Sequence, residues 1–347
     1  NGLLVLALIS NFMSGCAREE TSSGWKLWYA SPAEQWTEAL PVGNGSLGAM
    51  VFGGVAEERL QLNEDTMWAG SPVDRDKEGA WKFLDKAREL SFAGKFLEAE
   101  QIMHEKFQSE RWIRSYQTLG DLRVRFPEHK NPEAYRRELD LNQAIARVSY
   151  TQGDTLFTRE VFSSAPGHVL VVRLESSKPG ELNCVVKLDR PEQYETTVEN
   201  QILVMRGRVR QGEDPGEPAI DQSPRVGVGL NDDSRRHFLG VRYEARLEPR
   251  MEGGKIQFVD NHFEVSDADS VTLLLTASTD YGGLAPDETC VRRLAALSGT
   301  SYSDLKQAHL EEYQSLFDRV DLELGTKSPS ELPTDLRLRS VQEGSPD

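Results

Sequence analysis

The 347-residue sequence predicts a mainly β protein: a large two-sheet β-sandwich with an inserted helical pair, followed by an α-helical linker. Apolar and polar residues alternate in many short segments between Leu119 and Thr276, as they do in half-buried strands. Glycine, asparagine and aspartate pairs typical of tight turns separate these segments. After Asp280 the apolar residues recur at helical spacing. Many short strands with turns between them favour two packed sheets.

The amino terminus has the features of an export signal, and we expect residues 1–16 to be one. Leu3–Ile9 is a short apolar run, and small residues lead from it to Cys16. This pattern is similar to the lipobox of bacterial lipoproteins, so Cys16 would carry a lipid that anchors an exported protein in the periplasm or at the outer membrane. Residues 17–24 would be a polar tether. The missing methionine and basic start indicate a clipped front; the alternative is a buried helix with an incidental cysteine.

Trp25–Tyr29 is the first expected strand, and residues 40–70 form the unit around which the rest is organised. This unit begins with a glycine-dense turn at residues 43–48 and an apolar strand at 47–52. A glycine pair at 53–54 reverses the chain into a half-buried return strand at 58–62. A crowded polar and aromatic connection ends it, made of Asn63, Glu64, Asp65, Thr66 and Trp68.

The glycines of this unit also satisfy a dinucleotide-binding pattern. Gly43, Gly45 and Gly48 have the required spacing, and Glu64 lies about twenty residues further on, where a ribose-binding acid belongs. The mechanism, however, needs a helix directly after the glycines, so that its N-terminus meets the pyrophosphate. Residues 49–54 are too short and too rich in glycine for a helix, and we therefore reject a nucleotide-dependent dehydrogenase.

Helical and strand patterns follow in turn. Residues 79–92 carry apolar side chains on one helical face, Gly94 breaks that pattern, and residues 95–107 repeat it, so we expect an inserted helical pair. Gly253-Gly254 and Asp260-Asn261 are expected hairpin turns. The main strands expected after the pair are residues 122–126, 144–150, 155–162, 168–174, 182–188, 255–259 and 271–275, with a long surface loop at residues 211–224.

The carboxyl-terminal part is predicted to be helical. Residues 286–320 place six apolar or aromatic residues on one face, with a break near Gly299: Tyr302, Leu305, Tyr313, Leu316, Phe317 and Val320. A further helix is expected over residues 334–342.

Several motifs together resemble the α-L-fucosidases of glycoside hydrolase family 95. The motifs are Trp36 with ALPVGNGSLGAMVFGG and ERLQLNEDTMWAGSP, SYQTLGDLRVRF at 115–126, residues 135–174, LLLTASTDY at 273–281, HLEEYQSLFDRVDLELG at 309–325 and LPTDLRLRSVQEG at 332–344. Their common order makes the resemblance far more specific than any one motif.

The resemblance implies a domain layout. Residues 25–284 would be the N-terminal β-sandwich, 285–325 a helical linker and 326–347 the truncated start of a catalytic (α/α)6 barrel. In the family, the barrel holds a glutamic acid that protonates the leaving oxygen, and asparagines and an aspartate that activate water for inversion. The barrel proper is absent from this chain, so the resemblance implies no catalytic residue here and an inactive fragment of an enzyme, most simply a 1,2-α-L-fucosidase; an α-L-galactosidase is the alternative.

The candidate site residues are Asn63, Glu64 and Trp68, which we expect at the interface with the barrel or at the mouth of its pocket. The competing interpretation is that Glu64 and Asp65 merely brace a turn. Adjacent residues on a strand point to opposite faces, so these two carboxylates cannot flank one glycosidic bond.

Charge and composition exclude other functions. The net charge of −16 makes nucleic acid a poor partner. We expect no cofactor and no metal site, since His104, His168, His237, His262 and His309 lack ligand spacing and the residues 267–269 lack most calcium-loop ligands. The expected partners are a fucosylated glycan bound by the barrel, the catalytic domain itself, and a membrane reached only through the lipid. Whether Cys184 and Cys290 pair is left open.

A rival function is a free-standing carbohydrate-binding module. Trp25, Trp28, Trp36 and Trp68 could stack on sugars. The enzyme-fragment interpretation instead predicts an exposed apolar patch along Tyr302, Tyr313 and Phe317, where the barrel would dock.

Overall fold

The computed structural model describes residues 25–69, 76–108, 115–209, 240–322 and 332–344. Cys16, the expected tether at 17–24 and the expected loop at 211–224 lie outside these residues, so the lipoprotein prediction stays a prediction. Within the described part of the chain no helix is both long and apolar enough to cross a membrane.

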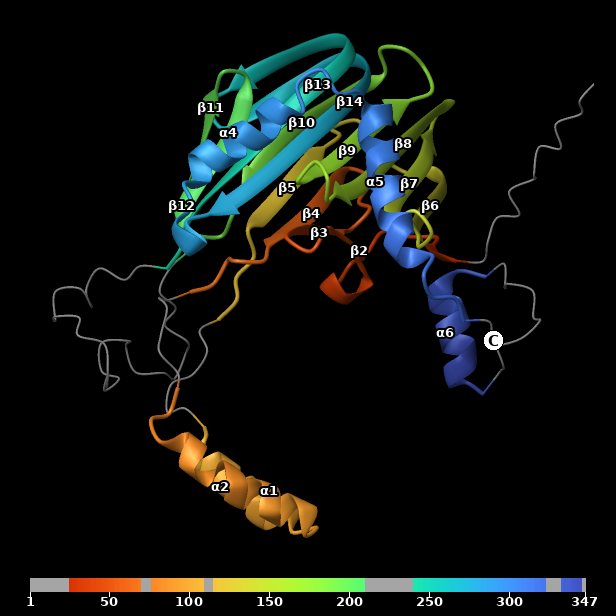
Figure 1. Ribbon diagram of the computed structural model, residues 1–347. Helices are drawn as coiled ribbons and strands as arrows, with labels where there is room; N and C mark the ends of the chain where they lie inside the picture. The colour runs from red at the N-terminus through yellow and green to blue at the C-terminus, as the bar shows by residue number, and fades with distance from the viewer. Residues whose placement is uncertain (1–24, 70–75, 109–114, 210–239, 323–331, 345–347) are drawn as a thin grey trace, which may run out of the picture.

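The described strands form one antiparallel sheet of 14 strands (Figure 1). Its order is β1-β6-β7-β8-β9-β14-β10-β5-β4-β3-β2, and β13, β12 and β11 extend from β14 as a branch. The strands are β1 Lys26–Tyr29, β2 Leu40–Gly43, β3 Leu47–Val51, β4 Glu57–Glu64, β5 Gly120–Arg125, β6 Glu133–Asp140, β7 Ile145–Gln152, β8 Thr155–Ser164, β9 Val169–Ser176, β10 Leu182–Asp189, β11 Tyr194–Glu199, β12 Ile202–Arg208, β13 Arg242–Val259 and β14 His262–Thr279.

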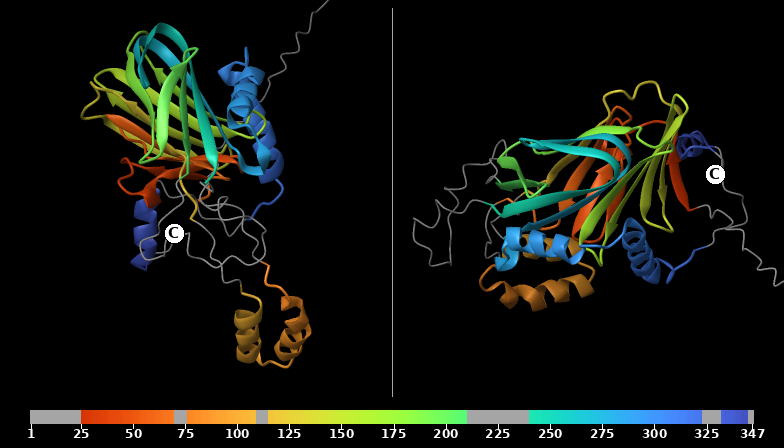
Figure 2. Two further views of the ribbon diagram at one scale, coloured as in Figure 1. Left: turned by 90° about the vertical axis from the view of Figure 1, so that its left-hand side faces the viewer. Right: turned by 90° about the horizontal axis from the view of Figure 1, so that it is seen from above.

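The two layers of the molecule are parts of this single sheet. The sheet curls until β2 and β3 pack against β7, β8 and β9, which stand far from them in the strand order. Figure 2 shows the two layers facing one another. The prediction of a mainly β, sandwich-like fold is confirmed, with the difference that the layers expected as separate sheets are joined by backbone hydrogen bonds.

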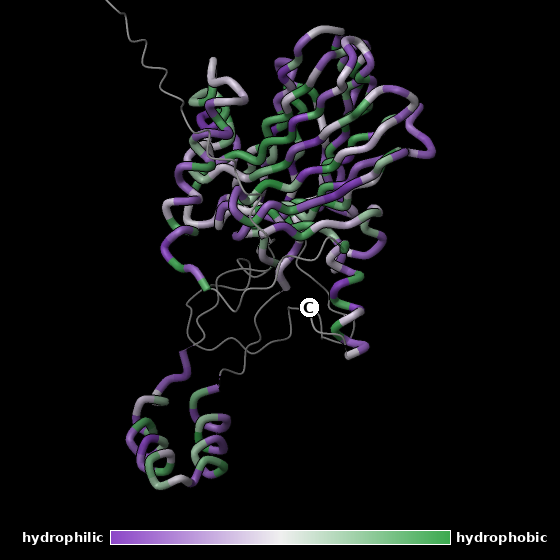
Figure 3. The backbone as a smooth tube through the Cα atoms, turned by 90° about the vertical axis from the view of Figure 1, so that its right-hand side faces the viewer, coloured by the Kyte–Doolittle hydropathy of each residue, from purple (hydrophilic) through white to green (hydrophobic). Residues whose placement is uncertain are grey.

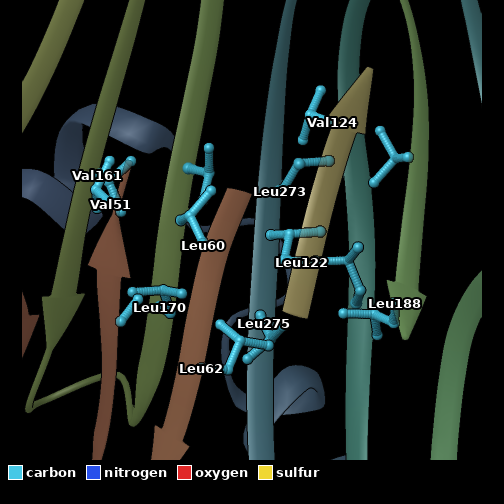
Figure 4. Close-up of a cluster of buried hydrophobic side chains, with 14 of the residues drawn as sticks. Val51, Leu60, Leu62, Leu122, Val124, Val161, Leu170, Leu188, Leu273 and Leu275 are labelled. Carbon is cyan, nitrogen blue, oxygen red and sulfur yellow. The ribbon is translucent and has the colours of Figure 1, made fainter. Parts of the chain in front are cut away.

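The core lies between the layers, where alternate residues of facing strands meet. Leu60 and Leu62 of β4, Leu122 of β5, and Leu273 and Leu275 of β14 are fully buried. Figure 4 shows these side chains converging between the strands. Burying a leucine stabilises the fold by about 1.5–3 kcal/mol, so the alternation seen in the sequence selects which face of each strand turns inward.

One expected turn is a bulge. Gly253 and Gly254 lie inside β13, where the pairing with β14 shifts register after Glu252, and their φ angles are 70° and 69°. A Cβ at Gly254 would collide with the carbonyl oxygen of Ser266. Glycine pairs supply the positive φ that both hairpins and bulges need, so the predicted hairpin at Gly253-Gly254 is wrong, whereas the turn at Asp260-Asn261 does join β13 to β14.

The inserted helical pair is confirmed. The 3₁₀ turn η2 Ala80–Phe83 leads into α1 Leu84–Phe92, and α2 Phe96–Lys106 follows Gly94. The pair stands apart from the sheet (Figures 1 and 2), and apolar and polar residues alternate along both helices (Figure 3). Its helices bury only Ala87, Leu90 and Ala99.

The carboxyl-terminal helices also form where expected. They are α4 Pro286–Ala296, α5 Tyr302–Phe317 and α6 Thr334–Gln342, and Gly299, with φ 77°, separates the first two. Ser301 caps α5 by accepting a hydrogen bond from the backbone N–H of Asp304. Short 3₁₀ turns lie at η1 Trp36–Glu38 and η4 Tyr281–Gly283.

Helix α5 packs its aromatic face on the sheet, which corrects the expectation of an exposed docking patch. The Tyr302 hydroxyl donates to the Glu160 carboxylate, and the Tyr313 hydroxyl donates to the carbonyl oxygen of Leu141 at 2.6 Å. Phe317 meets the edge of Trp25 with ring centroids 6.4 Å apart. Leu316 and Val320, expected on the same face, are instead 53% and 82% exposed, and Val320 lies beyond the end of α5. Tyr302, Tyr313 and Phe317 contact the sandwich and do not form an exposed patch for another domain.

A buried ion pair joins the two layers of the sheet. Arg159 of β8 and Glu58 of β4 have side chains only 2% and 1% exposed, and Nη1 of Arg159 lies 2.9 Å from Oε2 of Glu58. The arginine also donates to the backbone oxygens of Gly54 and Val55 and to the Tyr150 hydroxyl. Oε1 of Glu58 accepts from the Gly53 N–H. The pair therefore holds the β3–β4 reversal against β8.

Replacing the arginine should destabilise the fold strongly. We expect Arg159→Met to lower the free energy of unfolding by about 3–5 kcal/mol, because Glu58 would remain buried without its counter-charge. Burial already raises the pKa of Glu58, against the effect of Arg159. Urea unfolding of the 347-residue chain measures this, with the exposed Arg125→Met as the control that changes stability by less than about 0.5 kcal/mol. A loss below about 1 kcal/mol for Arg159→Met would contradict the assigned role.

Acid should weaken the attachment of α5. Burial raises the pKa of Glu160, but hydrogen bonds from Lys306, Tyr302 and Arg147 outweigh it and lower the pKa to about 2. A carboxyl with a lower pKa in the folded state stabilises the fold above its unfolded pKa, and that contribution is lost as the pH falls from about 4.5 towards 2. Discounted for solvent screening, it amounts to about 1–2 kcal/mol.

The test compares urea unfolding at about pH 6 and about pH 3. Glu160→Gln should show a smaller stability loss in acid than the unchanged chain, whereas Glu181→Gln, at an exposed position, should behave like the unchanged chain. An identical acid dependence for Glu160→Gln and the unchanged chain would disprove the role given to Glu160.

Candidate functional site at the end of strand β4

The three predicted site residues lie at the end of β4 and in the turn that follows it. β4 runs to Glu64, two residues beyond its expected end, and Asn63 and Glu64 pair with Gly48 and Leu47 of β3. Successive side chains of a strand point to opposite faces. Glu64 is accordingly buried and Asn63 half-buried, and the structure does not bring their side chains together.

Glu64 braces the turn, as the competing interpretation proposed. Its Oε2 accepts hydrogen bonds from the Thr66 N–H at 2.9 Å and from the Thr66 hydroxyl at 2.6 Å. The Thr66 hydroxyl also meets the hydroxyl of Thr279, the last residue of β14. Burial raises the pKa of Glu64, and the hydrogen bonds from Thr66 oppose the shift. This carboxyl is committed to local structure, while the side chain of Asp65 is exposed.

Trp68 presents its ring to solvent at the rim of the same turn. Its Nε1 donates to the carbonyl oxygen of Asp65 at 3.1 Å, and its ring meets Tyr116 edge-on with centroids 5.3 Å apart. Tyr116 in turn donates its hydroxyl to the carbonyl oxygen of Glu64 at 2.9 Å. These contacts fix the orientation of the Trp68 ring, and 42% of the residue's surface remains exposed to solvent. An indole ring held in this way can contact a ligand or a neighbouring domain.

The other tryptophans of the rival interpretation do not join Trp68 in one platform. Trp25 packs on Phe317 of α5, and the guanidinium of Arg136 lies 4.3 Å from the ring centre of Trp28. Trp36 is 54% exposed in η1. Sequence reasoning missed Tyr116 and Thr279, which complete the site, although both lie in motifs that the resemblance used.

The described residues contain no group of three or more histidine, cysteine, aspartate or glutamate side chains that could hold a metal ion. His309 lies against the sheet, where its Nε2 meets the carbonyl oxygen of Gln143, and burial lowers its pKa. His129 is buried beside Tyr150 with a pKa lowered to about 4 by burial and by Arg159, so this ring is neutral at pH 7. His237 lies outside the described residues.

The fold decides the state of the two described cysteines and the role of the glycine segment. Cys184 and Cys290 are both buried and both free thiols. Residues 47–51 form the strand β3, where a dinucleotide site would need a helix. The nucleotide interpretation is therefore excluded by the backbone of the glycine segment itself.

Comparison with known families finds two matches along the chain. Residues 27–283 match the glycosyl hydrolase family 65 N-terminal domain, and residues 301–347 match the glycosyl hydrolase family 95 catalytic domain. The second match begins at residue 301 and so includes α5. The resemblance inferred from the sequence motifs is confirmed.

Curated relatives carry related names. "Alpha-L-fucosidase 2" of Arabidopsis thaliana is 35% identical over 331 residues, which cover 90% of this chain and 38% of that protein. "Probable alpha-fucosidase A" of Aspergillus niger is 29% identical, over 92% of this chain and 40% of that protein. The protein of the same name from Aspergillus oryzae is 22% identical, over 86% and 41%. The chain thus spans about two fifths of the length of these relatives.

The adjacent carboxylates Glu64 and Asp65 allow a matched test of the turn. We expect Glu64→Ala to lower the free energy of unfolding by about 1–3 kcal/mol, because the N–H and hydroxyl of Thr66 lose their acceptor. Asp65→Ala should change it by less than about 0.5 kcal/mol. Thermal and urea unfolding measure both variants, and equal effects of the two substitutions would show that Glu64 does not brace the turn.

Proposed function

The chain belongs to the glycosyl hydrolases, with a family 65-type N-terminal domain followed by residues of a family 95 catalytic domain, and we propose that the whole protein is an α-L-fucosidase. The observation that carries this proposal is the order of the two matches in one chain whose relatives are named α-fucosidases. The described part of the chain is the scaffold of that enzyme. At the β4 site the exposed Trp68 would face the substrate or the catalytic domain, while Glu64 holds the turn that positions it.

The proposed reaction is the inverting hydrolysis of 1,2-linked α-L-fucose from oligosaccharides. An inverting glycosidase uses a general acid and a general base about 6.5–9.5 Å apart, so that a water fits between the base and the sugar. At the β4 site Glu64 is hydrogen-bonded to Thr66 and Asp65 is exposed. Glu64 and Asp65 therefore cannot serve as the general acid and the general base. We assign the acid and the water-activating groups to the family 95 catalytic domain.

The N-terminal domain would support catalysis mechanically. Helix α5 lies within the family 95 match, and it is fastened to β8 by Glu160, which accepts from Lys306 at 2.6 Å and from Tyr302. The opening helix of the catalytic domain is therefore packed on the sandwich. Such packing would fix the orientation of the two domains.

The experiment compares the 347-residue chain with the same chain extended by a complete family 95 catalytic domain. With 2′-fucosyllactose as substrate, the extended protein should release fucose, and proton NMR should show the β-anomer first. The 347-residue chain should release none above the buffer control, because we assign the acid and the water-activating groups to the catalytic domain and not to the β4 site. An α-anomer as first product would refute inversion, and fucose release by the 347-residue chain would refute the scaffold assignment.

Substrate choice is tested in the same assay. Preferred hydrolysis of a p-nitrophenyl α-L-galactoside over the fucoside would favour the alternative substrate. Lactose binding that Trp68→Ala abolishes, with no hydrolysis by either protein, would favour the carbohydrate-binding module instead.

A further inference from the structure

An open groove of about 530 Å³ lies between helix α4 and the strands β12 and β13, on the branch of the sheet that extends from β14. Helix α4 packs on β13 and β14 (Figure 1). The volume falls within the range of sites that hold small molecules. The apolar part of its lining comes from Val291, Leu294 and Ala295 of α4 and from Ile202 of β12.

The polar part of the lining belongs to a ladder of alternating charges on β13. Glu244, Arg246, Glu248 and Arg250 occupy every second position and so lie on one face of the strand. Nε of Arg246 is 2.5 Å from Oε1 of Glu244, and Nε of Arg250 is 2.7 Å from Oε1 of Glu248. Each guanidinium of the ladder thus has its own carboxylate, and the ladder carries no net charge.

The ladder is held rigidly by its surroundings. Arg250 donates through Nη1 and Nη2 to the carbonyl oxygens of Thr300 and Leu297, at 2.8 and 3.0 Å, just beyond the end of α4. Arg246 donates to Glu199 through Nη2, and its side chain is 10% exposed. Groups fixed in this way lose little conformational entropy when a ligand binds.

Hydrogen-bonding capacity remains for a ligand. Oε1 of Glu248 accepts a hydrogen bond from Nε of Arg250, and the Glu248 side chain is 25% exposed, so a ligand in the groove can reach this carboxylate. A carboxylate has about four acceptor positions, more than this one bond uses. Asn200, in the turn between β11 and β12 with φ 50°, also lines the groove. Its amide supplies both a donor and an acceptor.

We propose that this groove binds a neutral pyranose sugar. A pyranose has apolar C–H faces, which would lie on Val291 and Leu294, and neighbouring hydroxyls that both donate and accept, which would meet Glu248 and Asn200. An anion gains little here, because each arginine already has a carboxylate partner. The proposal concerns binding without bond cleavage, at a place separate from the β4 site, and it does not depend on the proposed hydrolysis.

Two adjacent alanines of α4 provide a matched test. Ala295 lines the groove, whereas Ala296 is exposed on the same helix outside it. The probes are L-fucose and D-galactose, titrated into the labelled 347-residue chain and followed by NMR. We expect saturable binding with a Kd of about 1 mM. Ala295→Trp fills the groove and should weaken binding at least about tenfold, while Ala296→Trp should leave the Kd unchanged.

A smaller change keeps the test independent of folding. Asn200→Ala removes one amide and should weaken binding about two- to tenfold, as expected for one hydrogen bond. Thermal unfolding checks that each variant is folded. If Ala295→Trp does not fold, the Asn200→Ala result decides.

Several outcomes would overturn the proposal. One is the absence of saturation by either sugar up to about 100 mM. Another is tighter binding of D-galacturonate or inorganic phosphate than of the neutral sugars, which would make the groove an anion site. Equal weakening by Ala296→Trp, or complete loss of binding in Trp68→Ala, would place the sugar elsewhere. Because no hydrolysis is measured, failure here is distinguishable from failure of the proposed fucosidase activity.

Discussion

The ion pair between Arg159 and Glu58 constrains the whole curled sheet. Taking both charges out of water costs several kcal/mol for each, and only a complete set of partners offsets this. Those partners come from the turn that joins β3 to β4, through the backbone of Gly53 and Gly54, and from Tyr150 on β7. Any slip of β8 relative to this turn would leave a buried charge unpaired. The ion pair therefore favours a single alignment of the two layers. Apolar packing alone would discriminate less between alternative alignments.

This constraint reaches the β4 site through the strand itself. β4 carries Glu58 near its start and Glu64 at its end, and it is paired with β3 and β5 on both sides. Fixing the start of the strand therefore places Glu64 and the turn after it. At the far end, Thr66 meets Thr279, from which the chain leaves the sheet for η4 and α4. The candidate site thus lies where the sandwich leads into the helices, which is where an interface with a catalytic domain would be expected.

Much of the fold could be predicted because its signals are local. Alternation located β4 and β5, and a continuous apolar run at residues 271–275 located part of β14. Helical spacing located α4 and α5, and Glu64 braces a threonine only two residues away. The predictions that were wrong concern features that depend on residues far away in the sequence. The same positive φ that serves a hairpin serves the bulge at Gly253-Gly254, and periodicity shows that α5 has an apolar face without showing what covers it. Likewise Tyr116 and Thr279 reach Glu64 and Thr66 across 52 and 213 residues.

The charge ladder of β13 shows why such distance matters for recognition. In the sequence, Glu244, Arg246, Glu248 and Arg250 look like an ordinary solvated strand face. In the fold, α4 crosses that face, and the pairing of each arginine with the preceding glutamate lowers the cost of covering it. Charges that are already neutralised attract no ion strongly, yet they remain fixed donors and acceptors along the groove. Hydroxyl groups suit such an array best, because one hydroxyl can donate to the Glu248 carboxylate and accept a hydrogen bond from a guanidinium.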